Sequence, residues 1–333
     1  MTRSRITVMM AVCLLPLAAF PQAATKKVTA PKAAAPGGQN SPRTPWGAPD
    51  LQGIWDFATI TPLERPSGLA GKDVFTDEEA AQFEKQTLEQ RNQDRRDGGS
   101  QADVSRAYNH FWWDFGTNVV ASKRTSLVVD PPDGRIPPLN EEGKKRAAYI
   151  AAKRSGLPAG PEDRNLWERC IVAPNAGPPM LPSAYNNNVQ IFQTPGNVVI
   201  LNEMINDARI VPLDGRPHIS GDIRQWRGDS RGRWEGNTLV VDTTNFRGDG
   251  GFRSASSNMH LVERFTRAGA DTLLYEFTVS DPATWTRAWS VALPMKKTEG
   301  PVYEYACHEG NYGMVNLLLG ARAQEKAAAE GKK

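Results

Sequence analysis

The sequence has 333 residues, with 40 basic and 37 acidic side chains and a formal net charge of +3. This near-balance, without a basic block interleaved with aromatic residues, argues against a nucleic-acid-binding surface. The 29 glycines and 25 prolines exceed their usual share, so long, shaped loops are expected around one large domain.

The first 24 residues follow the plan of a secretory signal peptide. Arg3 and Arg5 precede an apolar run from Ile6 to Phe20, and small residues such as Ala23 and Ala24 follow it. The run is shorter than the roughly 20 residues that span a bilayer. We therefore expect cleavage and a periplasmic or secreted mature chain without a membrane span. An uncleaved N-terminal anchor is the alternative.

Cleavage would leave 38 basic and 37 acidic residues, because it removes two of the 40 basic side chains. It would also leave two cysteines, Cys170 and Cys307. In an oxidising compartment such a distant pair indicates a disulfide, and two buried free thiols are the alternative. Soluble nucleotide cofactors are scarce outside the cytoplasm, so we expect a small-molecule ligand or substrate and no cofactor.

The N-terminal half mixes helical and irregular segments. Residues 25–45, rich in lysine, alanine, proline and glycine, predict a flexible linker, and residues 46–188 follow as a helical and loop elaboration. Thr76 and Glu79 form a capping box, and Asn140 can cap another helix. We expect helices at Glu78–Arg91 and Asn140–Lys153 and a strand at Thr125–Val129.

Residues 189–322 form a succession of short β-rich runs separated by turn-forming residues. Strands joined by short turns indicate an antiparallel meander, which avoids exposed edges most simply by closing into a barrel. A twisted open sheet or a sandwich is the alternative. A terminal helix is expected from Gly313, with residues 323–333 fraying. The predicted strands are Val189–Gln193, Val198–Glu203, Arg209–Leu213, Thr238–Asn245, His260–Thr266, Thr272–Ser280, Trp285–Leu293 and Val302–Cys307.

Two charges interrupt apolar stripes on the predicted strands. Alternate residues of a strand share a face, which places Glu263 and Arg287 among apolar neighbours. A buried charge needs a partner, and these two could satisfy each other. They would then form either a polar cluster in a small-molecule site or an ion pair that only fixes strand packing.

Histidine and glutamate at strand ends can transfer protons near neutral pH. Metal binding by loosely spaced histidines is an alternative, although no HExxH or paired CxxC supports it; a structural hydrogen-bonded role is another. The candidate catalytic residues are His260, Glu263, Arg287, His308 and Glu309. The candidate ligand-binding residues are Tyr185, Asn187, His218, Tyr275, Trp285 and Trp289.

Gly228–Gly232 matches G-x-S-x-G, the nucleophile elbow of hydrolases. That motif needs a strand before it and a helix after it. Because a strand is predicted shortly after it, we interpret the segment as a turn and not as the site of a catalytic Ser230.

Several longer motifs resemble those of a large family of secreted bacterial proteins for which no activity is established. The resemblance covers residues 46–322 and implies an extracytoplasmic location. Gly53-Ile54-Trp55 also resembles the Gly-x-Trp that opens the first strand of lipocalin-like (calycin) barrels. The family motifs are Pro45–Trp55, Ser126–Arg135, Asp214–His218, Gly228–Gly232, Trp234–Asp242 and Ala306–Tyr312.

The expected fold is therefore mainly β (α+β), a lipocalin-like antiparallel β-barrel with an N-terminal helical and loop elaboration. Two functions are carried forward. The first is a cofactor-independent acid–base enzyme, such as a lyase, isomerase or hydrolase, with His260 or His308 as acid or base, Glu263 or Glu309 as its partner and Arg287 stabilising an anion. The second is a carrier of an apolar or aromatic small molecule.

Overall fold

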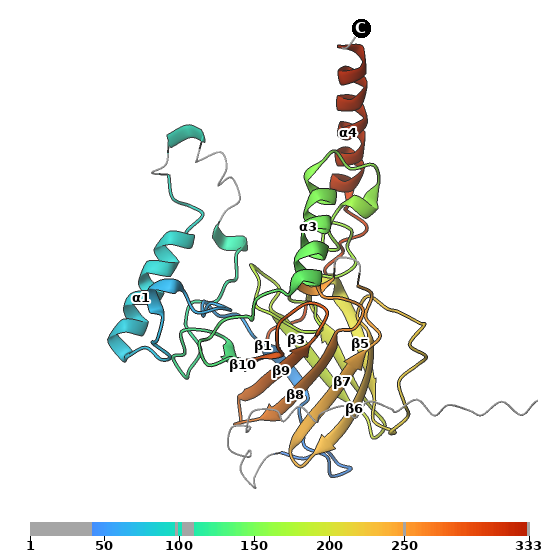
Figure 1. Ribbon diagram of the computed structural model, residues 1–333. Helices are drawn as coiled ribbons and strands as arrows, with labels where there is room; N and C mark the ends of the chain where they lie inside the picture. Colours follow the sequence, from blue (N-terminus) through green and yellow to red (C-terminus); the bar gives the residue numbers. More distant parts are fainter. Residues whose placement is uncertain (1–41, 97–98, 102–109, 249–250, 332–333) are drawn as a thin grey trace, which may run out of the picture. The chain divides into compact units, whose positions relative to one another are not determined.

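The computed structural model describes residues 42–96, 99–101, 110–248 and 251–331 (Figure 1). The predicted signal peptide and most of the predicted linker lie outside these residues. Within them the protein is a mainly β α+β fold, built on a ten-stranded antiparallel sheet and a few helices. No helix in this part of the chain combines the length and apolarity needed to cross a membrane.

The sheet joins two antiparallel meanders through one strand from the N-terminal half. The strand order is β5-β4-β3-β1-β10-β9-β8-β7-β6, and β2 pairs with β10. The prediction of one uninterrupted meander is therefore wrong, because β1 lies between β3 and β10. The strands are β1 (Gly53–Asp56), β2 (Val128–Asp130), β3 (Asn188–Gln193), β4 (Asn197–Asn202), β5 (Asp207–Pro212), β6 (Asp229–Glu235), β7 (Thr238–Thr244), β8 (His260–Arg267), β9 (Thr272–Ser280) and β10 (Trp289–Thr298).

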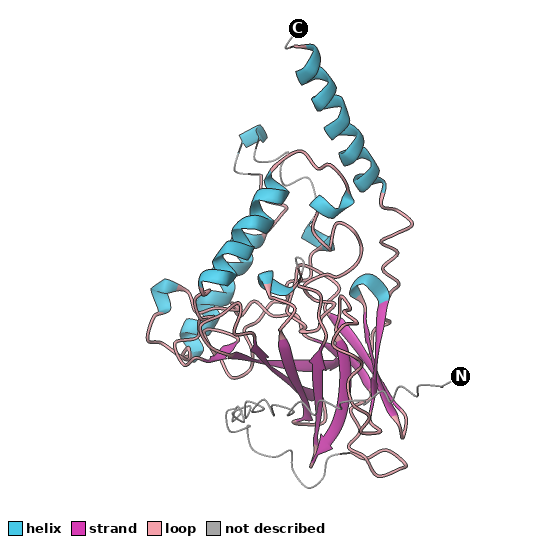
Figure 2. Ribbon diagram, turned by 45° about the vertical axis from the view of Figure 1, so that its right-hand side comes forward, coloured by secondary structure: helices cyan, strands magenta, loops and turns pink. Residues whose placement is uncertain are grey.

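The sheet curls strongly, although its two end strands are not paired. No ladder joins β5 with β6 among the described residues, so strand pairing does not close a barrel. Arg209 on β5 and Glu263 on β8 are six strand steps apart, roughly 30 Å along a sheet with about 4.8 Å per step. Their side chains nevertheless form an ion pair, with Nη2 of Arg209 2.9 Å from Oε1 of Glu263. Figure 2 shows that the strands, drawn in magenta, lie at different angles and not in one flat layer.

Large side chains fill that interior. Burial alternates along β8 and β9, and Glu263 shares the buried face of β8 with apolar neighbours, as predicted. The largest of the core side chains are less than 2 % exposed, and they include Trp55, Phe265, Tyr275, Phe277 and Trp289. The inside of the curled sheet is therefore a packed core.

Side-chain caps fix the starts of the helices. In α1 (Asp77–Arg91) Thr76 and Glu79 make the predicted capping box, and Asn140 caps α3 (Glu141–Ser155) by accepting from the Gly143 amide at 2.8 Å. Both predicted helices are thereby confirmed. α4 spans Tyr312–Glu330. Short 3-10 helices lie at Ser67–Leu69, His110–Trp112, Pro161–Asp163, Met204–Asn206 and Phe252–Ser254.

Close packing holds the start of α3 against the loop that precedes β10. A Cβ atom at Gly143 would lie 2.4 Å from the Thr284 carbonyl oxygen, so only glycine fits there. Arg146 donates to the carbonyl oxygens of Ser254 at 2.8 Å and Ala283 at 3.0 Å. α3 is thus bonded to the loops on either side of the β8–β9 hairpin.

Three predicted segments are corrected by the structure. Val302–Cys307 is irregular and not a strand, and in it the Tyr303 amide donates to the Glu203 carboxylate at 3.1 Å instead of to a neighbouring strand. Trp285 makes only an isolated bridge with Leu139, so β10 starts four residues later than predicted, at Trp289. Asp229–Gly232, predicted as a turn, opens strand β6, and Gly228 before it has a φ of +67°.

The predicted disulfide is present. Cys170 and Cys307 are bonded, with their Cα atoms 5.7 Å apart. The bond ties the irregular segment before α4 to the loop that follows α3. A disulfide is consistent with an extracytoplasmic location.

Replacing Arg209 with leucine should lower the free energy of unfolding by about 3–5 kcal/mol, because it leaves the Glu263 carboxylate buried without a counter-charge. Urea unfolding followed by tryptophan fluorescence measures the loss. Arg287→Leu is the matched control, since the Arg287–Asp130 pair is exposed and should contribute only about 0–1 kcal/mol. Equal losses in the two variants would show that the buried pair does not anchor the curl.

Candidate functional site

The structure does not bring the five predicted catalytic residues together. Glu263 lies in the core, where Arg209 binds both its oxygens and the Tyr275 hydroxyl donates to Oε1 at 2.9 Å. The Met180 amide in turn donates to the Tyr275 oxygen at 3.0 Å. Burial and the negative charge of Glu263 raise the pKa of Tyr275 well above its usual value, so the phenol keeps the proton that it donates. Of the two interpretations of Glu263, this geometry favours the structural ion pair.

Arg287 lies outside the core, in the loop before β10. Its Nη2 contacts both carboxylate oxygens of Asp130, each at 2.9 Å, and the side chain is exposed. The expected Glu263–Arg287 pair is therefore wrong. The prediction failed because β10 begins only at Trp289. Arg287 lies before that strand, so the alternation of strand faces does not apply to it.

His308 and Glu309 are exposed in the turn before α4. Neither side chain makes a hydrogen bond within the described part of the chain. Nothing in the geometry connects them with His260 or Glu263.

Most of the predicted ligand-binding residues have structural contacts. Asn187 is buried, and its amide nitrogen donates to the carbonyl oxygens of Asp114 at 2.7 Å and Ser183 at 2.9 Å. Tyr185 packs against Tyr305, with ring centroids 6.4 Å apart. Tyr275, Trp285 and Trp289 belong to the main hydrophobic core.

His218 and His260 meet at one carboxylate on β7, which sequence reasoning did not single out. Asp242 Oδ1 lies 3.0 Å from His218 Nε2, and Asp242 Oδ2 lies 2.8 Å from His260 Nε2. His218 Nδ1 reaches a second carboxylate, Asp229, at 2.8 Å. Cross-strand pairing explains the meeting, since Asp242 opposes Val262 on β8, two residues from His260. The signal available in the sequence was that Asp242 and His260 lie on two consecutive predicted strands, which can pair and bring the two side chains together.

The contacts shift the pKa values of this cluster in opposite directions. The hydrogen bond to Asp242 raises the pKa of His260 above 6.5. Burial pushes the pKa of Asp242 up, but the hydrogen bonds from His260 and His218 outweigh it, and the value falls below 3.8. His260 Nδ1 has no hydrogen-bond partner in the described chain, and its side chain is 45 % exposed. A histidine held by a carboxylate at one nitrogen and open at the other can accept and release a proton.

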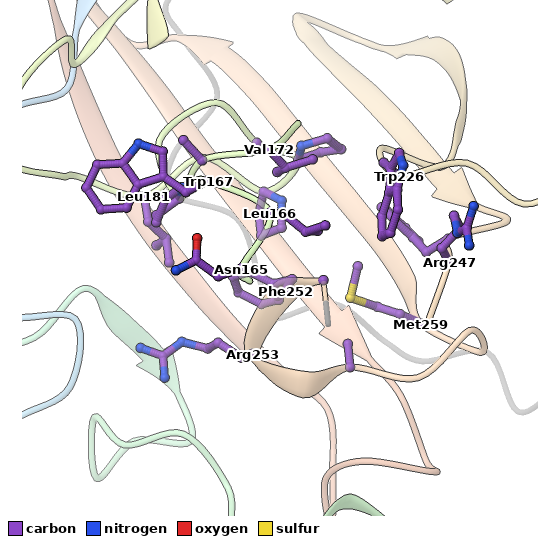
Figure 3. Close-up of a pocket in the computed structure, with 18 of the residues that line it drawn as sticks. Asn165, Leu166, Trp167, Val172, Leu181, Trp226, Arg247, Phe252, Arg253 and Met259 are labelled. Atoms are coloured by element: carbon purple, nitrogen blue, oxygen red, sulfur yellow. The ribbon is translucent and has the colours of Figure 1, made fainter. Parts of the chain in front are cut away.

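A cavity of about 350 Å³ lies beyond the ends of β7 and β8. The loop after α3 (residues 165–181) and the described parts of the loop between β7 and β8 (246–248 and 251–259) form its walls, with Trp226 between them; we call it the aromatic pocket. In Figure 3 Leu166 and Phe252 lie near the centre of the pocket, and Trp167 and Trp226 lie on opposite sides of it. Its lining includes Asn165, Leu166, Trp167, Val172, Leu181, Trp226, Phe246, Arg247, Phe252, Arg253 and Met259.

Ring and cation contacts hold the aromatic walls in place. The Arg247 guanidinium lies 4.4 Å from the Trp226 ring centroid, a cation–π contact. Phe252 stacks on the buried Trp289 at 5.9 Å between centroids. Next to it, Arg253 and Ser254 both adopt positive φ values, 46° and 61°. Such backbone conformations in non-glycine residues persist only where the surroundings impose them, and they cluster at functional sites.

None of the predicted ligand-binding residues lines the aromatic pocket. The available signal was two tryptophans, Trp167 and Trp226, that lie outside every predicted strand. Sequence reasoning could not join them, because the walls come from loops separated by more than fifty residues along the chain.

No group of three or more histidine, cysteine, aspartate or glutamate side chains in the described chain is arranged to hold a metal ion. The chain matches no protein-family model, and comparison with curated proteins also finds no match.

The proton NMR titration of His260 should have its midpoint above 6.5, and Asp242→Asn should lower it. The raised pKa means that the His260–Asp242 contact stabilises the fold fully below pH 6.5 and that this stabilisation is lost as pH rises through the folded-state value. Asp133→Asn, which removes an exposed carboxylate elsewhere, serves as the control. A midpoint unchanged by Asp242→Asn would refute the assigned cause.

Proposed function

We propose that the protein binds an apolar, aromatic small molecule in the aromatic pocket. The observation that carries the proposal is the pocket itself, about 350 Å³ in volume and walled by Trp167, Trp226 and Phe252. Ligand sites typically measure about 300–1,000 Å³ and combine apolar walls with a few polar groups. Asn165 and Arg247 are polar groups of this kind.

The packing of the sheet supports a site at its end and not in its interior. Tyr275, Phe277 and Trp289 fill the space that a lipocalin-like carrier would keep open. A ligand there would have to displace well-packed aromatic rings, whereas the aromatic pocket offers its volume without rearrangement.

Covalent and polar contacts preform both walls of the pocket. Cys170 lies in the wall formed by residues 165–181 and is bonded to Cys307. In the wall formed by the loop between β7 and β8, Ser256 donates two hydrogen bonds to the buried carboxylate of Asp281, from its amide at 2.6 Å and from its hydroxyl at 2.8 Å. A preformed site loses little conformational entropy on binding, which favours affinity for a small ligand.

Acid–base catalysis is the second candidate function, and the Asp242–His260 contact favours it. The carboxylate fixes which nitrogen of His260 carries a proton and leaves Nδ1 to act on a substrate. His260 directly follows Met259, which lines the aromatic pocket. Such a reaction would use the proton affinity of His260, and Glu263 would have no part in it.

Trp226→Ala should weaken binding of the uncharged fluorescent probe N-phenyl-1-naphthylamine about tenfold or more, because it removes one aromatic wall. Fluorescence titration gives the affinity. Trp112→Ala, a tryptophan that is exposed and lines no part of the pocket, should leave binding unchanged. Equal losses in both variants, or no binding to the unaltered protein, would refute the proposal.

His260→Ala tests the catalytic candidate on any substrate found by screening for turnover. Loss of turnover by roughly a hundredfold or more, with probe affinity retained, is expected for a general acid or base. Full turnover in the variant would leave binding as the function and exclude His260 from the chemistry.

A further inference from the structure

The aromatic pocket has a polar end on the side away from Trp226. Asn165 and Arg253 lie at this end, as Figure 3 shows. No aspartate or glutamate is among the described residues that line the pocket. The charged side chains of this lining are therefore all arginines, and none of them faces a carboxylate that belongs to the lining.

The Arg253 guanidinium has no direct partner in the described chain. It makes no hydrogen bond there, and no carboxylate oxygen comes within the 4.0 Å of an ion pair. Partial desolvation lowers the pKa of Arg253, and the more distant Glu64 carboxylate offsets only part of this effect. Glu64 is itself engaged, since its Oε1 accepts from the Ile136 amide at 2.9 Å. Arg253 is also exposed to solvent, so an incoming anion can reach it.

The turn that carries Arg253 is held in place. Arg253 and Ser254 have φ values of 46° and 61°, which non-glycine residues adopt only where the surroundings impose them. The Ala255 amide donates to the Phe252 carbonyl oxygen at 2.8 Å, and Arg146 donates to the Ser254 carbonyl oxygen at 2.8 Å. The cation therefore starts from a fixed backbone, which reduces the entropy lost when it binds a ligand.

The other two arginines of the lining are already engaged. Arg154 and Arg247 each have an interaction partner, and the Arg247 guanidinium also lies against the Trp226 ring. A ligand in the pocket thus meets one available positive charge, at Arg253. An anion with a single negative charge matches it, whereas a second negative charge would be desolvated without compensation.

Asn165 supplies a neutral donor beside this charge. Its Oδ1 accepts a hydrogen bond from the Glu168 amide at 2.8 Å. This contact decides which end of the side-chain amide is the oxygen, because a backbone amide can only donate. The Asn165 Nδ2 has no acceptor in the part of the chain that the structure describes, so it can donate to a ligand. A guanidinium fork and an amide donor together suit a planar carboxylate, which accepts through both oxygens.

We propose that the ligand is an aromatic carboxylate, with its ring against Trp226 and Phe252 and its carboxylate held by Arg253 and Asn165. This ligand class rests on the proposed binding function and extends it. The ring uses the apolar walls, and the carboxylate supplies the single negative charge that Arg253 lacks in the described chain. The planar fork of arginine binds a carboxylate through two parallel hydrogen bonds.

Isothermal titration calorimetry with 1-naphthoate and 1-naphthamide tests the ligand class, because the two probes have nearly the same shape and differ in charge. The carboxylate should bind about tenfold tighter or more at low ionic strength, since hydrogen bonds between charged groups are stronger than neutral ones. Raising the salt concentration should reduce this advantage. Arg253→Gln should remove most of it and leave the 1-naphthamide affinity nearly unchanged, because glutamine keeps the stem of the side chain.

Arg216→Gln is the matched control, since Arg216 is exposed and does not line the aromatic pocket. It should change neither affinity. Equal affinities of the unaltered protein for the two probes would overturn the carboxylate inference and leave the proposed binding function intact, as would an advantage that survives Arg253→Gln. Tighter binding of 1-naphthyl phosphate than of 1-naphthoate would contradict the match to a single charge. Failure of both naphthalene probes to bind would instead refute the proposed function.

Discussion

The ion pair between Arg209 and Glu263 is the contact on which the curvature of the sheet depends. Each charge is buried, and moving either one out of water costs several kcal/mol unless a partner compensates it. The partners stand on strands far apart in the pairing order, so compensation is available only when the sheet curls until β5 and β8 face each other. The pair specifies the geometry of the fold more than it adds to its stability.

The curl has a direct consequence for where a ligand can bind. Tyr275 donates its hydroxyl hydrogen bond to Glu263, and aromatic residues around it complete the packing. Space for a ligand is left at the end of the sheet, where loops rich in glycine and proline cross. These loops are held by the Cys170–Cys307 bond and by the carboxylate of Asp281. The scaffold and the site thus use separate sets of polar residues.

Local patterns in the sequence predict the parts of this fold that local forces decide. Strand β9 was predicted with the bounds that the structure has, because its alternation is uninterrupted. Both helix starts followed from the side chains of Thr76 and Asn140. The disulfide was predicted from the oxidising compartment that the signal peptide implies and from the two cysteines left in the mature chain. The strand predicted at Val302–Cys307 is absent, because this segment has no neighbouring strand to pair with. Whether a neighbour is available depends on the whole sheet and not on the local sequence.

The candidate site was predicted only in part. His218 and His260 were recognised as residues of interest, but Asp242, which joins them, is one ordinary aspartate in a strand until β7 and β8 are in register. The partner of Glu263 was predicted to be Arg287 and is Arg209, because the alternation of faces could not show where β10 begins. The aromatic pocket has no local pattern, since its walls meet only through the tertiary fold.

An aromatic ligand is therefore expected in the aromatic pocket at the end of the sheet. Anomalous diffraction from a co-crystal with 4-bromo-1-naphthol tests this position most directly. A bromine peak is expected between Trp226 and Phe252, which both line the pocket. A bromine peak inside the curled sheet, or on a surface away from the aromatic pocket, would contradict the proposed binding site.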